Sequence, residues 1–179
     1  MGVKTLKLAY VFSFGMLIIS GLFHLLTYFP TNAYDNQLFI FVLTVATFPP
    51  FYIGIKSLKK EFAAQQIKNP HIAYQQVLSS VKEALSKNVI WVGIALVAYV
   101  FFNFFFSILF LNQGLGPDIV NGTYVLQDHG RIVKEITATE YALHRRYEMR
   151  GISGHPVLFQ FIALNMIDWS LKKSKTPAD

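Results

Sequence analysis

The chain has 179 residues, of which 53% are hydrophobic, 16% aromatic and only 15% charged. With a mean hydropathy of +0.39 it has too little polar surface to cover a compact water-soluble domain, so we expect an α-helical polytopic membrane protein. The lack of cysteine excludes disulfide scaffolds, thiol nucleophiles, thiolate zinc sites and iron–sulfur clusters. In a membrane protein the placement of basic residues along the chain matters more than the net charge of +6, so we expect no nucleic acid partner.

Residues 8–29 and 38–55 form the first two apolar segments. At about 1.5 Å per residue, the first is long enough for a hydrocarbon layer of ~30 Å, and its apolar core is too long for the alternative, a cleaved signal peptide. Pro49 and Pro50 predict a kink in the second segment, and a packing kink is favoured over a hinge or pore bend. Neighbouring helices or hydroxyls such as that of Thr47 must then bond the freed carbonyls.

Residues 56–88 are polar but rich in helix formers, with a break at Asn69-Pro70. This pattern predicts a cytoplasmic helical hairpin whose arms continue the second and third membrane helices; the alternative is an amphipathic stripe that lies flat on the headgroups. Residues 89–111 follow as the third and most uniform apolar segment, in which Asn103 and Ser107 are the polar side chains apart from the interfacial Trp91.

Residues 113–154 predict a small outer cap. The alternating pattern of residues 123–136 predicts a β-hairpin with a three-residue loop at 128–130. Thr137 and Glu140 match a capping box, so a short helix should follow over residues 138–150. Gly151, Gly154 and Pro156 should end that helix.

Residues 155–171 form the last membrane helix that we expect. The apolar part, 157–171, reaches only about 22 Å, but a complete crossing is favoured over a re-entrant or interfacial helix. The segment 56–88 contains six lysines, the loop 30–36 contains none, and residues 113–156 hold five basic and five acidic side chains. This distribution predicts about four spans in a cell inner or plasma membrane, with both termini cytoplasmic.

Polar side chains within the membrane are candidate functional residues by default, and here they are His24, Asn103, Asn165 and Asp168. His24 and His155 are expected at the same depth, where they could hold a haem or metal or relay protons. Because no CxxCH or HExxH motif is present, we expect no cofactor and favour a structural His24 bonded to Asn103, Ser107 or His155. Asp168 could act as a coupling carboxylate, although an ion pair with Lys172 is the simpler interpretation.

The four arginines, Arg131, Arg145, Arg146 and Arg150, all fall in the cap. They could bind an anionic headgroup, but the five acidic residues of this segment, equal in number to its basic residues, favour pairing with Asp128, Glu135, Glu140 and Glu148. Glu140, His144 and Glu148 follow at four-residue steps, which suits a metal, although an exposed polar face is favoured.

The chain shows no P-loop and no GxSxG or GxGxxG motif, so an enzyme is not favoured. The leading hypothesis is a non-enzymatic membrane protein that binds a protein partner or a second copy of itself, as an accessory or assembly subunit or as a toxin-immunity factor. The alternative is a cofactor-binding protein, or a small-solute channel or transporter that uses Asn103, Asn165 and Asp168.

Overall fold

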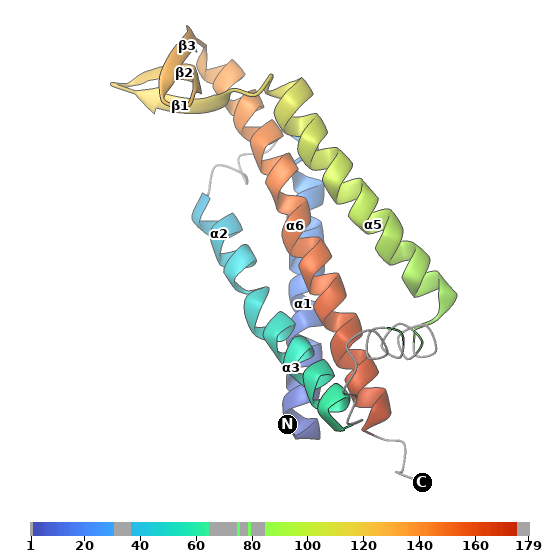
Figure 1. Ribbon diagram of the computed structural model, residues 1–179. Coiled ribbons are helices and arrows are strands. Elements are labelled where there is room, and N and C mark those ends of the chain that lie inside the picture. Colours follow the sequence, from blue (N-terminus) through green and yellow to red (C-terminus); the bar gives the residue numbers. More distant parts are fainter. Residues whose placement is uncertain (1, 31–36, 65–74, 76–78, 80–84, 175–179) are drawn as a thin grey trace.

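The computed structural model describes residues 2–30, 37–64, 75, 79 and 85–174 (Figure 1). Its elements in chain order are the helices α1 (Val3–Leu26), α2 (Gln37–Val45), α3 (Phe48–Ala64) and α5 (Lys87–Phe105), the short π-helix η2 (Phe106–Leu111), the strands β1 (Gly116–Val120), β2 (Thr123–Asp128) and β3 (Arg131–Glu135), and the helix α6 (Ala138–Lys173). The start of α1 and the end of α6 lie at one end of the molecule, and the sheet lies at the other (Figure 1).

Three helical stretches are long and apolar enough to cross a membrane: Val3–Leu26, Leu38–Lys60 and Lys87–Leu111. They confirm three of the four segments that the sequence predicts. Their faces carry large apolar side chains that nothing in the described chain covers, such as Leu8 and Phe110, which are 73% and 71% exposed. Hydrocarbon is the environment that suits such faces.

The helix α6 is one continuous helix of 36 residues, so the predicted break at residues 151–156 is wrong. Pro156 lies inside it and removes the N–H group that would bond the carbonyl of Ile152. The Nδ1 of His155 donates to that carbonyl at 3.0 Å, which lets the helix continue without an unpaired acceptor. Residues 155–171 therefore continue a helix that begins in the cap, and their crossing of a membrane stays a prediction.

The two glycines that were expected to end the helix instead allow close packing. A Cβ on Gly151 would lie 3.2 Å from the Cβ of Ser107, and one on Gly154 would lie 3.2 Å from Cγ2 of Val100. Small residues let helices approach closely, and here they bring α6 against α5 and η2.

The second apolar segment is divided between α2 and α3, just ahead of the two prolines, as predicted. Pro50 has no N–H group for the carbonyl of Ala46, four residues earlier. The Nε2 of Gln160 on α6 donates to this carbonyl at 3.1 Å, and the hydroxyl of Thr47 donates to the carbonyl of Thr44 at 2.6 Å. A neighbouring helix and a hydroxyl thus both supply donors at the break.

The packing of α1 on α6 follows steps of three and four residues, the pattern of a coiled-coil seam. The positions are Leu6, Ala9, Ser13, Met16, Ser20, Phe23 and Thr27 on α1 and its C-cap, and Met149, Ser153, Pro156, Gln160, Ala163, Ile167 and Ser170 on α6. All of these positions are buried or half-buried. Small and hydroxyl-bearing residues are frequent among them, as is typical of helix interfaces in membranes.

The strands β1, β2 and β3 form an antiparallel sheet in that order. The predicted hairpin is β2–β3, but its loop contains two residues, His129 and Gly130, with φ angles of 48° and 85°. The strand β1 was missed because Gly116 and Pro117 suggested only a helix end. An equivalent turn at Asn121 and Gly122 joins it to β2, with φ angles of 51° and 82°. In each of these two turns both loop residues have positive φ, which is typical of type I′ hairpins.

The predicted cytoplasmic hairpin, residues 56–88, lies mostly outside the described residues. The helix α3 continues to Ala64, in agreement with a first arm that extends the second span. The second arm does not continue into α5 as expected, since α5 begins at Lys87 and Ser86 caps it by accepting a hydrogen bond from the Val89 amide at 3.4 Å. A side-chain cap satisfies an amide that has no partner in a preceding helical turn.

Candidate functional site: a buried polar network below the cap

His24 lies in the last turn of α1 and is only 6% exposed. Its Nδ1 is 2.7 Å from Oγ of Ser153 on α6, and its Nε2 is 2.6 Å from the hydroxyl of Tyr99 on α5. The imidazole points into the bundle and links three helices. The partners differ from the expected Asn103, Ser107 and His155. The orientation of α5 and α6 about their axes turns Tyr99 and Ser153 toward His24 instead.

The hydrogen bonds continue from Tyr99 toward the cap. The hydroxyls of Tyr99 and Tyr28 are 2.6 Å apart, the Tyr28 hydroxyl donates to Oδ1 of Asn103 at 3.2 Å, and Nδ2 of Asn103 donates to the carbonyl of Arg150 at 2.7 Å. We call Ser153, His24, Tyr99, Tyr28 and Asn103 the His24 row. It starts at a buried serine and reaches Tyr28, which is 42% exposed.

One order of donors satisfies the whole His24 row. Because Tyr28 donates to Asn103, Tyr99 must donate to Tyr28, and Nε2–H of His24 must donate to Tyr99. In a neutral imidazole, Nδ1 then accepts from the hydroxyl of Ser153, so both ring nitrogens are occupied. This arrangement fits a structural histidine and leaves no free nitrogen for a metal.

Arg150 joins α6 to the outer end of α1. Its guanidinium lies 4.2 Å from the ring centre of Tyr28 and 5.6 Å from that of Tyr147, and its Nη2 donates to the carbonyl of Thr27 at 3.1 Å. Thr27 is the C-cap of α1, where a positive charge is favourable and free carbonyls need donors. Arg150 is therefore engaged within the bundle.

His155 does not face His24, so the two imidazoles do not form the pair that the sequence left open as an alternative. Its Nδ1 bonds the Ile152 carbonyl, and its ring lies edge to face with that of Phe104 on α5, with ring centres 5.3 Å apart. In a continuous helix, His155 is rotated by about 200° from Ser153, the residue that does face His24. The sequence interpretation missed that Ser153 faces His24 because it expected α6 to break at residues 151–156.

The other three arginines lie at separate places in the cap. Arg131 is exposed on β3, whereas Arg145 is 5% exposed and forms an ion pair with Glu148. Arg146 is half-buried, and its Nε has no hydrogen bond within the described part of the chain. The Arg145–Glu148 pair is one of the predicted ion pairs, and the four guanidinium groups do not gather around one site.

Glu140, His144 and Glu148 occupy one face of α6 but have different partners. Glu140 completes the predicted capping box with Thr137, whose backbone and side-chain hydrogen bonds hold the pKa of Glu140 below its usual value. His144 bonds Oδ1 of Asn112 through Nδ1 at 3.0 Å, and burial lowers the pKa of this histidine. Among the described residues, no three His, Asp or Glu side chains are placed to hold a metal ion.

Asp168 and Asn165 lie near the opposite end of α6. Asp168 pairs with Lys172 at 2.6 Å, the simpler of the two interpretations, and Nδ2 of Asn165 donates to the carbonyl of Phe161 at 2.7 Å. No hydrogen bond in the described part of the chain links either residue to the His24 row. The predicted polar set is thus divided between two ends of the bundle.

Gln160 is a central residue that the sequence interpretation missed. It is completely buried, its Oε1 accepts from the hydroxyl of Ser13 at 2.9 Å, and its Nε2 bonds the carbonyl of Ala46. It therefore joins α6 to α1 and to the break before α3. The three- and four-residue spacing along residues 149–170 was the available signal, because it places Gln160 on the same face as Ser153.

No model of a known protein family matches the chain, and no curated protein or solved structure is significantly similar to it.

Proposed function

We propose that the protein is an integral membrane protein that binds another protein, or a second copy of itself, through its cap. We define the cap as the β1–β3 sheet and the first turns of α6. In this proposal four helices cross the membrane, the termini are cytoplasmic and the cap lies on the outer face. The role is non-enzymatic, as in an accessory or assembly subunit or a toxin-immunity factor.

The observation that carries the proposal is the free edge of β3. All five residues of this strand are exposed, including Ile132 and Val133 at 49% and 55%, and within the described part of the chain β3 pairs with β2 on one side only. An exposed strand edge presents unpaired backbone N–H and C=O groups to which an extended segment of another protein can be added. The apolar side chains then supply contacts beside the backbone hydrogen bonds.

The sheet is fixed firmly to the membrane helices. The amide of Ile136 donates to the carbonyl of Tyr124 at 2.9 Å, and the ring of Tyr124 lies 5.0 Å from that of Tyr141 on α6, centre to centre. The capping box follows at once, so β3 leads directly into the 36-residue helix. A rigid connection of this kind holds the strand edge in one place and lowers the entropy lost on binding.

Charge and helix direction support the membrane topology. Exposed lysines lie at the terminal end of the bundle on α1, α3, α5 and α6: Lys4, Lys7, Lys56, Lys59, Lys60, Lys87, Lys172 and Lys173. The positive-inside rule places this end in the cytoplasm. Since the chain has no cysteine, Thr123→Cys and Ser174→Cys should react with an impermeant maleimide from opposite sides. Labelling of both from one side would contradict four spans.

Site-specific photo-crosslinking tests the binding edge. A photoreactive residue at Ile132 should give a discrete protein adduct in intact cells, whereas the same residue at Phe110 on the apolar face should not. Val133→Asp should abolish the adduct, because a carboxylate at the edge disfavours an added strand. An adduct of twice the 20.4 kDa chain mass indicates a second copy. An absent adduct, or one that Val133→Asp leaves unchanged, would contradict the proposal.

A further inference from the structure

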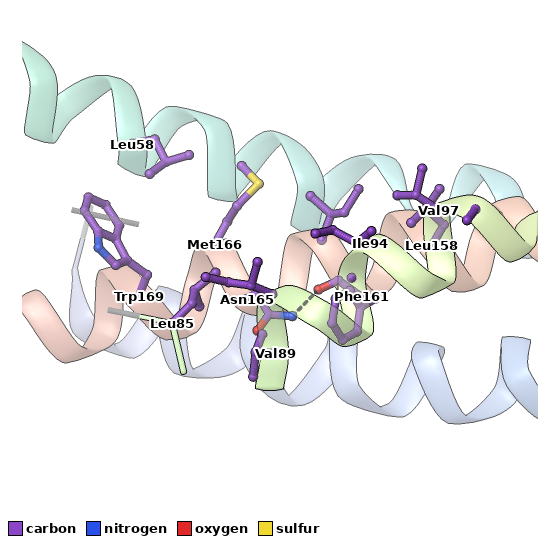
Figure 2. A pocket seen from close by; sticks show the side chains of 14 residues that line it. Leu58, Leu85, Val89, Ile94, Val97, Leu158, Phe161, Asn165, Met166 and Trp169 are labelled. Carbon is purple, nitrogen blue, oxygen red and sulfur yellow. Dashed lines mark hydrogen bonds between the residues drawn. The ribbon is translucent and has the colours of Figure 1, made fainter. Parts of the chain in front are cut away.

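A cavity of about 590 Å³ lies between α3, α5 and α6, where α5 diverges from α6 (Figures 1 and 2). Figure 2 shows Leu58 and Trp169 at one end of this cavity and Val97 and Leu158 at the other. The lining side chains are apolar apart from the amide of Asn165, and Trp169 contributes its indole ring. We call this space the apolar cavity.

The dimensions of the apolar cavity suit a long apolar group. Its volume lies within the range of about 300–1,000 Å³ that is usual for ligand sites. On α5 its lining extends from Val89 to Ala98, about 14 Å along the helix axis. Its apolar walls give water few hydrogen bonds, so an apolar occupant is expected.

Trp169 lies at one end of the apolar cavity and has a buried indole N–H. Trp169 is only 3% exposed, and its Nε1 is buried without a hydrogen-bond partner in the described part of the chain. A buried indole N–H usually finds a partner, so the occupant should carry an acceptor next to its apolar part. The Nζ of Lys173 lies 5.2 Å from the ring centre of Trp169, which adds a positive charge at this end.

Exposed lysines flank the lining residues on all three helices. Lys59 and Lys60 follow Leu58 on α3, Lys87 precedes Val89 on α5, and Lys173 follows Trp169 on α6. An elongated apolar space with an unpaired donor and several cations at one end has the chemistry of a site for a lipid with an anionic headgroup.

We propose that the apolar cavity binds one acyl chain of an anionic phospholipid from the leaflet nearest the termini. An ester carbonyl oxygen of the lipid accepts from Nε1 of Trp169, and the phosphate lies among the lysines. This inference rests on the proposed membrane insertion.

Fluorescence quenching by brominated lipids tests the site, because Trp91 and Trp169 are the two tryptophans of the chain. The variant Trp91→Phe, which leaves Trp169 as the reporter, is placed in phosphatidylcholine vesicles with increasing fractions of brominated phosphatidylglycerol or brominated phosphatidylcholine. Half-maximal quenching should need about fivefold less of the anionic lipid, the preference that one nearby lysine provides.

Two leucine substitutions separate the apolar cavity from the general lipid contact. A Cβ on Gly93 would lie 3.4 Å from Cε1 of Phe161 beside the cavity, so Gly93→Leu should fill part of the site and remove the preference for the anionic lipid. The matched variant Gly15→Leu adds the same side chain on α1, where a Cβ meets nothing within 4 Å. It should leave the preference unchanged.

Equal quenching by the two brominated lipids, unaffected by Gly93→Leu, would overturn the proposed site for an anionic lipid. The variant Trp169→Phe tests insertion separately, since it leaves Trp91, which is 68% exposed on α5. If both lipids quench Trp91 while Trp169 shows no preference, the lipid site alone fails. If neither lipid quenches Trp91, the proposed membrane insertion fails with it.

Discussion

The helix α5 packs against α6 in two different ways along its length. Toward the cap, Gly151 and Gly154 bring the helices together, and Tyr99 and Asn103 extend hydrogen bonds to α1 and α6. Toward the termini, α5 diverges and large apolar side chains surround the apolar cavity. Apolar surfaces gain little free energy by packing together in lipid. Small residues and hydrogen bonds therefore hold α5 against α6 near the cap, whereas the half near the termini leaves room for the proposed lipid.

The largest expected effect comes from overpacking the close half. A leucine at Gly154 would crowd Val100, so Gly154→Leu should lower the free energy of unfolding by about 1–3 kcal/mol. Gly93→Leu on the other half has space in the apolar cavity and should cost less than half as much. Reversible unfolding of both variants in mild detergent measures the difference, and equal losses would contradict the two packing modes.

A smaller loss is expected at Gln160, which bonds two other parts of the bundle. Gln160→Leu removes the contacts with Ser13 and with the Ala46 carbonyl, and should cost about 1–2 kcal/mol of unfolding free energy. Asn165→Leu is the matched control, because the Asn165 amide donates within its own helix, to the carbonyl of Phe161. If the two variants lose equal stability in the same detergent assay, the link from α6 to the break before α3 contributes nothing.

His24 should have a similar or slightly smaller effect. His24→Leu removes the bonds to Ser153 and Tyr99 and should cost about 0.6–2 kcal/mol, whereas His24→Gln retains a donor and an acceptor and should recover part of that loss. Proton flux into vesicles provides the second measurement. If the wild-type protein conducts protons and both variants abolish the flux at nearly normal stability, the His24 row is a proton relay rather than a structural link.

The smallest expected effect is a pH dependence confined to the cap. Burial lowers the pKa of His144, so below about pH 6.5 the unfolded chain binds a proton more readily than the folded chain and the cap loses stability. Hydrogen bonds from Thr137 lower the pKa of Glu140, and the stability that they provide above its unfolded pKa is lost at more acidic pH as Glu140 becomes protonated.

Hydrogen exchange of the cap amides between pH 7 and 5, corrected for the intrinsic exchange rate, measures the effect of His144. Protection should decrease with acidification in the wild-type protein. His144→Gln cannot titrate but still offers a donor to Asn112, so its protection should remain nearly constant. An identical decrease in both proteins would assign the pH dependence to another group.

The sequence by itself determined the features that depend on local patterns. Length and hydropathy predicted four spans, and three of these segments are helices long and apolar enough to cross a membrane. The prolines after Ala46 predicted the break between α2 and α3, and the spacing of Thr137 and Glu140 predicted the start of α6. The alternation around His129 and Gly130 predicted β2 and β3. Each of these features follows from the conformational preferences or the hydropathy of neighbouring residues, which are readable without a partner.

Tertiary structure decided the features that depend on groups distant in sequence. The continuity of α6 across Pro156 relies on the donor from His155 and on close contact of Gly151 and Gly154 with the third span, so residues that break an isolated helix do not break this one. The same continuity turns His155 away from His24 and aligns Ser153 with it. The apolar cavity likewise exists only because α5 diverges from α6, and the angle between two helices results from all of their contacts together.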